Sequence, residues 1–261
     1  MKQRVIGAGV LLAILICSIL ISRTLFSIVI FLVAEVGFRE LMHIKYQDNI
    51  KDLNFVKVMG MVFLGIILLN NVLYTIDINF TILLPIIGMT LPIVFYNNSK
   101  KYNINDALYV LGIIFFLGFS FGTICNLSVT NVYQCIFIFM IAFVTDTYAY
   151  IGGLLIGKHK LTSISPKKTW EGSIIGALMG TIIGSVYYFY VVGNLDLIWV
   201  IILSLVLSIL SEVGDLVFSS IKRYFNKKDY SNLIPGHGGI LDRFDSVIFV
   251  ALGMCLLLSI L

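Results

Sequence analysis

Nine long apolar stretches divide this chain, and none has the two-residue alternation of a membrane β-barrel strand. Hydrocarbon offers no water to backbone N–H and C=O groups, so a segment that crosses it must be a helix or part of a closed barrel. Hydrophobic residues make up 59% of the 261 positions, and charged residues only 12%. The sequence therefore predicts an all-α, polytopic integral membrane bundle. The expected spans, each close to the length of about 20 residues that crosses a bilayer, are 5–22, 24–38, 57–75, 78–96, 108–124, 131–153, 173–192, 197–217 and 244–261.

The positions of lysine and arginine predict the orientation of the bundle, because basic loops stay on the cytoplasmic side. With nine crossings and a cytoplasmic amino terminus, all of the 18 basic residues except Arg23 fall inside, and the carboxyl terminus lies outside. The expected location is a bacterial-type inner (plasma) membrane. The first stretch runs into the second without a small-residue cleavage site, so we expect it to be retained. We divide the single membrane domain into amino-terminal helices, 1–130, and carboxyl-terminal helices, 131–261.

Acidic residues inside the apolar stretches point to a function. A carboxylate in the bilayer costs roughly 3 kcal/mol even on insertion scales, and such groups usually face a polar cavity. Asp146 lies late in one predicted span, and Asp215 lies near the inner end of another. Glu212, one turn before Asp215, could share its cavity, and Glu40 lies toward the inner end of the second span.

The first long polar stretch, 154–172, suits a polyphosphate. Ser165 precedes a proline and favours a turn, and Thr169 marks the entry into the next helix. Lys167 and Lys168 would then sit beside the free amides of a helix amino terminus, which attract anions. The alternative is that these lysines only follow the positive-inside rule and bind anionic headgroups.

The second long polar stretch, 218–243, combines cations, glycines and carboxylates. Lys222, Arg223 and Lys228 precede a turn that reads Pro-Gly-His-Gly-Gly over 235–239. Its glycines let the backbone approach a ligand closely, and His237 is interpreted as an acid, a phosphate donor or a turn residue. Asp242 and Asp245 follow, three residues apart at the expected start of the last helix. They could ligate a metal, or they could simply cap the helix.

These features all fall on one predicted face of the membrane. Cations there would hold phosphates, and carboxylates would hold Mg²⁺, which needs only one or two protein carboxylates when water and phosphate oxygens complete its shell. The combination is typical of metal-assisted phosphoryl or nucleotidyl transfer.

Specific motifs in the carboxyl-terminal half of the chain resemble those of the phosphatidate cytidylyltransferases, also called CDP-diacylglycerol synthases. The segment from Ser219 to Asp245 reads S-S-I-K-R-Y-F-N-K-K-D-Y-S-N-L-I-P-G-H-G-G-I-L-D-R-F-D. Upstream, the segments around Asp146, 157–158, 165–172 and 214–216 are also similar to that family. The resemblance covers roughly the carboxyl-terminal half. Two positions depart from it: Phe218 stands where many members carry an acid, and Leu154 where many carry a basic residue.

The resemblance implies that CTP and phosphatidate react to give CDP-diacylglycerol and pyrophosphate, with Mg²⁺ and possibly a second cation as cofactor. It implies no nucleic acid partner and allows a homodimer. The residues expected to act in catalysis are Asp215, Asp242, Lys222, Arg223 and His237, of which His237 is expected to position or hydrogen-bond. Those expected to bind substrate are Lys167, Lys168, Ser165, Ser219, Lys228, Gly236, Gly238, Gly239 and Arg243. The expected metal ligands are Asp215 and Asp242, followed by Asp146 and Asp245.

Three other functions remain open from the sequence. A CTP-dependent lipid kinase would use the same groups but would transfer the γ-phosphate to a lipid alcohol and release CDP. A transporter could line an ion path with Asp146 and Asp215, but no repeated halves with broken helices are visible. A structural subunit with headgroup-binding loops would leave the buried acids unexplained.

Overall fold

The computed structural model describes residues 2–47, 53–95, 102–233 and 238–259, and none of these lies in a β-strand. The chain falls into two compact units, residues 1–129 with 229–241 and residues 130–228 with 242–261. The first unit contains α1 (Lys2–Ile21), α2 (Arg23–Tyr46), α3 (Asn54–Leu73), α4 (Ile78–Phe95) and nearly all of α5 (Ile104–Thr130). The second contains α6 (Val132–Ile156), α7 (Trp170–Tyr187), the π-helical continuation η2 (Tyr188–Val192), α8 (Leu197–Tyr224) and α9 (Leu241–Leu258), whose first residue is counted with the first unit.

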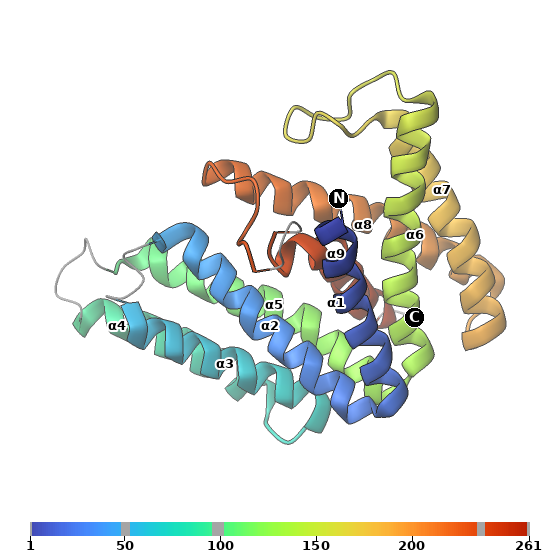
Figure 1. Cartoon of the computed structure of the whole chain (residues 1–261). Helices are drawn as coiled ribbons and strands as arrows, with labels where there is room; N and C mark the ends of the chain where they lie inside the picture. Colours follow the sequence, from blue (N-terminus) through green and yellow to red (C-terminus); the bar gives the residue numbers. More distant parts are fainter. Residues whose placement is uncertain (1, 48–52, 96–101, 234–237, 260–261) are drawn as a thin grey trace. The chain divides into compact units, whose positions relative to one another are not determined.

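In the second unit, α6 and α7 lie side by side and are joined by the polar 157–169 loop (Figure 1). Glycines recur every four residues along one face of α7, at Gly172, Gly176, Gly180 and Gly184. A Cβ atom added to Gly176 would lie 2.7 Å from the Ala149 Cβ atom, and one added to Gly180 would lie 2.4 Å from the Ser208 Oγ atom. This stripe therefore lets α7 pack closely against both α6 and α8, as small-residue faces do between membrane helices.

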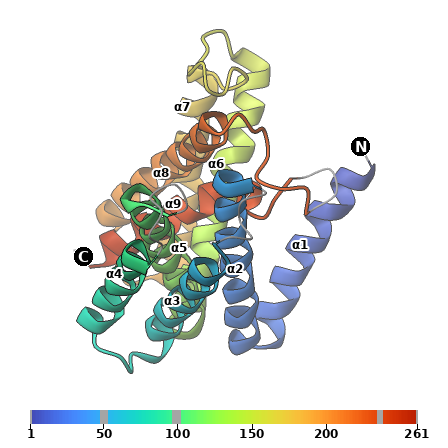
Figure 2. The same ribbon diagram turned by 90° about the vertical axis from the view of Figure 1, so that its left-hand side faces the viewer.

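In the first unit, α3 and α4 form an antiparallel hairpin (Figure 2). Rings cover glycines on neighbouring helices, with Phe38 of α2 over Gly60 of α3 and Phe63 of α3 over Gly88 of α4. These pairs allow large aromatic groups to pack where two helices approach closely. Glycine also permits a close approach of α5 to α3 at Gly118, where the neighbour is the aliphatic side chain of Ile67.

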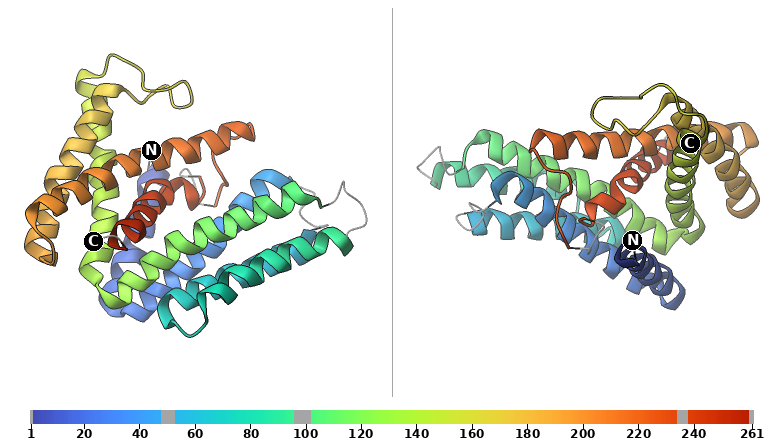
Figure 3. Two further views of the ribbon diagram at one scale, coloured as in Figure 1. Left: turned by 180° about the vertical axis from the view of Figure 1, so that it is seen from behind. Right: turned by 45° about the horizontal axis from the view of Figure 1, so that its top comes forward.

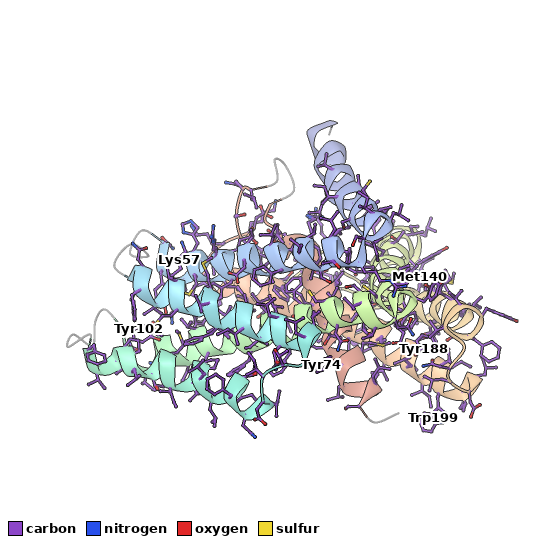
Figure 4. The ribbon with its side chains drawn as sticks, turned by 90° about the horizontal axis from the view of Figure 1, so that it is seen from below. Lys57, Tyr74, Tyr102, Met140, Tyr188 and Trp199 are labelled. Carbon is purple, nitrogen blue, oxygen red and sulfur yellow. The ribbon has the colours of Figure 1, made fainter. Side chains whose placement is uncertain are left out.

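Polar side chains fix the ends of these helices. Asn70 of α3 donates to Thr81 of α4 at 3.0 Å and accepts from the Ile76 amide at 2.9 Å, which closes the α3–α4 turn. Tyr74, at the carboxyl end of α3, bonds to Asn126 of α5. The Tyr102 hydroxyl donates to the Met89 carbonyl at 2.9 Å and ties α4 to the start of α5. Tyr74 and Tyr102 are labelled in Figure 4.

The described helices include six that are long and apolar enough to cross a membrane: α3, α4, α5, α6, α7 with η2, and α8. The predicted all-helical class is confirmed, and the chain is an integral membrane protein. The nine crossings and the orientation of the termini stay predictions. α2 mixes acidic and basic residues into its second half, and the part of α1 whose side chains are described, Gly9–Ile21, forms an apolar stretch shorter than these six.

Several helices continue beyond their predicted apolar limits. The span predicted at 197–217 reaches Tyr224, and the last helix begins at Leu241 and not near residue 244. Hydropathy marks the part of a helix that meets hydrocarbon, whereas backbone hydrogen bonding continues into polar surroundings. Lys222 and Arg223 therefore lie on the last turn of α8, where cations also complement the helix dipole.

Candidate functional site

One face of α8 carries most of the groups of the candidate site. Glu212, Asp215, Ser219 and Lys222 recur at intervals of three and four residues, so they line the same side of the helix. α9 passes next to this part of α8 (Figure 3). A Cβ atom on Gly214 would lie 2.8 Å from the Asp245 carbonyl oxygen, so only glycine permits this approach. The close crossing brings the acids of α8 and α9 together.

Two lysine–aspartate pairs tie the site together. The Lys168 Nζ atom lies 2.6 Å from the Asp215 Oδ2 atom, and Ser219 donates to the Oδ1 atom of the same carboxylate at 3.2 Å. The Lys222 Nζ atom lies 2.6 Å from the Asp242 Oδ1 atom. The side chains of this second pair are only 11% and 3% exposed. Each predicted principal metal ligand thus has a lysine as its immediate neighbour.

Further acids surround these pairs. Asp146 of α6 accepts a hydrogen bond from the Ser246 hydroxyl of α9 at 2.9 Å, and Asp245 accepts from the Ser246 amide at 3.0 Å. Asp245 is close enough to Asp146, Asp215 and Lys222 for their charges to interact. The site as a whole contains five carboxyl groups, from Asp146, Glu212, Asp215, Asp242 and Asp245, and two ammonium groups, from Lys168 and Lys222.

Glu212 belongs to the same cluster. It is buried, interacts electrostatically with Lys168, Asp146 and Asp215, and accepts a hydrogen bond from Ser173 of α7. The sequence pointed to Glu212 through its position one turn before Asp215. Nothing in the sequence marked Ser173 or Ser246, because their partners lie on other helices.

Backbone hydrogen bonds within the 157–169 loop place Lys168 next to Asp215. The Lys168 amide donates to the Ser165 carbonyl at 3.0 Å, which confirms the predicted turn, and its carbonyl accepts from the Leu161 amide at 2.9 Å. Thr169 accepts from the Gly172 amide at 3.2 Å and caps α7, as its position predicted.

A carboxylate on the first turn of α7 secures the other side of this loop. Glu171 accepts from the amides of Lys158 and His159 at 3.1 and 3.2 Å, and lies 2.6 Å from the His159 Nδ1 atom. The sequence predicted the loop as a phosphate site but gave no sign of this anchor. The His159 and Glu171 pairing depends on the hairpin fold of the loop.

The remaining predicted site residues differ in exposure and in the unit to which they belong. Arg223 is exposed and donates to the Lys227 carbonyl at 3.1 Å, at the end of α8. Lys167, Lys228 and Arg243 are also exposed, and Ser165 is half-buried. Gly238 and Gly239 belong to the first unit, where they are buried. Gly236 and His237 lie outside the described residues, so their predicted roles stay predictions.

Phe218, one of the two departures from the family pattern, has a packing role. Its ring is fully buried and meets the Phe249 ring of α9 edge-on, with centroids 6.4 Å apart. An apolar contact between α8 and α9 therefore stands at the position where the sequence departs from the resembled family. Leu154, the second departure, is exposed.

The chemistry of the donor set fits Mg²⁺, which prefers carboxylate oxygen. If all five acids and both lysines of the site are ionised, the acids exceed the lysines in charge, so the site attracts cations. No three Asp, Glu, His or Cys side chains in the described ranges are grouped to hold an ion by themselves. A magnesium ion here would therefore draw part of its shell from substrate phosphates and water, as is usual for this ion.

Comparison with known proteins identifies the family. A family model described as "Cytidylyltransferase family" matches residues 2–261. The chain belongs to the cytidylyltransferase family. The match includes the amino-terminal helices, which the motifs recognised in the sequence did not cover.

Three curated bacterial relatives of this cytidylyltransferase-family chain carry the name phosphatidate cytidylyltransferase. Those from Staphylococcus haemolyticus and Staphylococcus saprophyticus are each 40% identical over 154 residues. The one from Staphylococcus aureus strain COL is 37% identical over 155 residues. In each case the aligned part covers 59% of this chain and 59% of the relative's own length.

Proposed function

We propose that this chain is a phosphatidate cytidylyltransferase, which converts CTP and phosphatidate into CDP-diacylglycerol and pyrophosphate. The observation that carries the proposal is the cluster of α6, α8 and α9 acids with Lys168 and Lys222, in a chain of the cytidylyltransferase family. The names of the relatives support the same reaction. A membrane-embedded enzyme also suits a substrate that is confined to a leaflet.

In this reaction a phosphate oxygen of phosphatidate attacks the α-phosphorus of CTP. A new P–O bond joins the two phosphates, the bond from the α-phosphorus to the bridging oxygen breaks, and pyrophosphate leaves with those electrons. The attacking phosphate is already anionic at neutral pH, so no strong general base is required. The chain's contribution is alignment and charge neutralisation.

The two lysines are the groups best placed to bind phosphates. Lys168 comes from the 157–169 loop, and it shares the Asp215 carboxylate with the Ser219 hydroxyl. We infer that Lys168 can leave Asp215 for a triphosphate oxygen, since a partly exposed pair is held together weakly. Lys222 is buried with Asp242, so we infer that it keeps that partner and acts on phosphate as a fixed positive charge.

Mg²⁺ is the cofactor that we propose, with Asp215, Asp242, Asp146 and Asp245 as its candidate ligands. When bound, it would neutralise charge on the triphosphate and stabilise the charge that develops at the reacting phosphorus. The carboxylates of α6, α8 and α9 would hold the ion, and the Ser246 and Ser219 hydroxyls donate to two of them, Asp146 and Asp215.

We further propose nine membrane crossings, with the amino terminus and the active site on the cytoplasmic face, where CTP is available. The distribution of basic residues supports this orientation. The family resemblance also allows a homodimer, which size-exclusion chromatography with light scattering would detect in the purified protein.

The deciding experiment is an assay of detergent-solubilised protein with Mg²⁺ and CTP labelled in the cytosine ring, supplied with phosphatidate in one reaction and with a lipid alcohol such as diacylglycerol in another. We expect label in a lipid product. Labelled CDP in solution, with unlabelled phosphate on the lipid, would instead identify a lipid kinase. No turnover of CTP in a folded preparation would contradict both functions.

Asp215→Asn tests the site within the same assay. The substitution keeps the size of the side chain but removes its charge, so we expect turnover to fall by at least about 10²-fold while the protein still inserts in the membrane. Asp196→Asn is the matched control, because Asp196 is an exposed acid at the other end of α8. Near-normal activity of Asp215→Asn would remove Asp215 from the site.

A further inference from the structure

Glu40, on α2, is a buried acid that binds the polar segment leading into α9. It is 4% exposed, and its carboxylate accepts three hydrogen bonds. The Ser231 hydroxyl donates to the Oε1 atom at 2.6 Å, and the amide of Ile240 donates to the same atom at 2.9 Å. The amide of Leu241 donates to the Oε2 atom at 2.9 Å. Glu40 therefore holds both ends of the 231–241 segment, whose described residues belong to its own unit.

The two hydrogen bonds donated by backbone amides lie where α9 starts. Leu241 is its first residue, and the first amides of a helix have no partner within the helix. A carboxylate satisfies them and also complements the positive end of the helix dipole. Here that carboxylate comes from a residue 200 positions earlier in the chain. Glu40 thus performs for α9 the task that a local capping residue usually performs.

The glycines before α9 fit this arrangement. Gly238 has a φ of 80°, a conformation that glycine adopts without strain. Gly239 is required for another reason, because a Cβ atom there would lie 2.4 Å from the Glu40 Oε1 atom and 2.6 Å from Oε2. The absence of a side chain at Gly239 lets the Glu40 carboxylate reach the amides of Ile240 and Leu241.

We propose that Glu40 is a positioning residue for catalysis, which sets the start of α9 and through it the placement of Asp242 and Asp245. The inference rests on the proposed function. Asp242 follows Leu241 directly, and Asp245 lies one turn later. A shift of the first turn of α9 would move both carboxylates relative to the groups of α6 and α8.

The test compares Glu40→Gln with Glu35→Gln. Gln keeps the size of the side chain but removes its charge. Its side-chain NH₂ group is a donor and would replace one of the two oxygens that accept from backbone N–H groups. Glu35 is also a buried acid of α2, but its Oε2 atom has no hydrogen-bond partner in the described part of the chain. The Glu35 variant therefore controls for the loss of a buried acid from this helix.

Three measurements are made on full-length protein in detergent. They are hydrogen exchange of the amides in 238–246, thermal unfolding, and kcat and KM for CTP. For Glu40→Gln we expect faster exchange at Ile240 and Leu241, a melting temperature close to that of the wild type, and a fall in kcat of about 10²-fold, the scale of an ångström-sized misplacement. Glu35→Gln should change neither exchange in this peptide nor kcat.

Gly239→Ala provides a second route to the same result. Its methyl group would push the Glu40 carboxylate from the amides, so exchange and kcat should change as in Glu40→Gln. Normal kcat in both variants, with an active wild type, would overturn the inference and leave the proposed function intact. Loss of kcat only in step with global unfolding would also overturn it, in favour of a structural role. An inactive wild type would overturn the proposed function and this inference together.

Discussion

At the scale of single residues, the two lysine–aspartate pairs differ in burial, and this separates their roles. Lys222 and Asp242 have side chains that are 11% and 3% exposed, whereas those of Lys168 and Asp215 are 23% and 29% exposed. Breaking a buried pair leaves an uncompensated charge and costs about 3–5 kcal/mol. A pair in contact with solvent contributes about 1 kcal/mol or less. The first pair is therefore costly to break, whereas the second can exchange partners.

Replacing each lysine by methionine checks this difference. We expect Lys222→Met to lower the free energy of unfolding by about 3 kcal/mol, because the buried Asp242 carboxylate loses its ammonium partner. Lys168→Met should lower it by about 1 kcal/mol or less, but should still raise KM for CTP. Thermal unfolding in one detergent, with CTP kinetics on the same preparations, compares the two. Equal destabilisation by both variants would show that the difference in exposure has no energetic consequence.

The sequence predicted the participants of the site better than their partners. Asp146 and Asp215 stood out because acids are costly near hydrocarbon. Asp242 and Asp245 stood out through their spacing at the expected start of the last helix. No local rule connects Lys168 with Asp215, which lies 47 positions later, or Glu40 with Ile240, which lies 200 positions later. Such pairings depend on how helices pack, and a single sequence does not encode that packing in any local pattern.

At the scale of elements, close helix packing is set by glycine. The α7 stripe lets backbones approach, so that Gly180 lies against the hydroxyls of Thr145 on α6 and Ser208 on α8. Hydrophobic association contributes little between helices within lipid, so packing of this kind is a main source of stability. The site depends on it, because α6 carries Asp146 and α8 carries Asp215.

Gly180→Ala tests the contribution of the stripe. Its Cβ atom would lie 2.3 Å from the Thr145 Oγ1 atom and 2.4 Å from the Ser208 Oγ atom, so these side chains or their helices would have to shift, and we expect a loss of about 1–3 kcal/mol in stability. Gly112→Ala is the matched control, since a Cβ atom there meets nothing within 4 Å. It should be neutral or slightly stabilising, because alanine favours helix. Thermal unfolding of the two variants would contradict the packing argument if Gly180→Ala matched Gly112→Ala.

Element positions followed from hydropathy, but their ends and contacts did not. Each of the nine predicted spans corresponds to a helix among the described residues. The polar turns at the end of α8 were predicted as part of a loop, because hydropathy reports the surroundings of a helix and not its backbone hydrogen bonds. The spacing of the α7 glycines was visible in the sequence, but which helices they face depends on the fold.

At the scale of the whole molecule, the charge distribution and the helix lengths together predict that α7 crosses the membrane. α7 with η2 spans 23 residues, which at 1.5 Å per residue is about 35 Å, enough to cross a hydrocarbon core of about 30 Å. The basic 157–169 loop precedes it, and the loop at 193–196 follows it. If α7 crosses the membrane, these two loops lie on opposite sides of it. The positive-inside rule then places the basic 157–169 loop on the cytoplasmic side.

Cysteine labelling measures this directly. In a background from which Cys17, Cys125, Cys135 and Cys255 are removed, Lys160→Cys places a thiol in the first loop and Asn194→Cys places one in the second, both at exposed positions. A membrane-impermeant maleimide should label Asn194→Cys in intact spheroplasts, and should label Lys160→Cys only after permeabilisation. Asp77→Cys, in the α3–α4 turn, should behave like Asn194→Cys, because the nine-crossing arrangement puts both turns outside. The reverse pattern would place the lysines of the 157–169 loop away from cytoplasmic CTP and contradict the proposed orientation. Labelling of both Lys160→Cys and Asn194→Cys from one side of the membrane would mean that α7 does not cross.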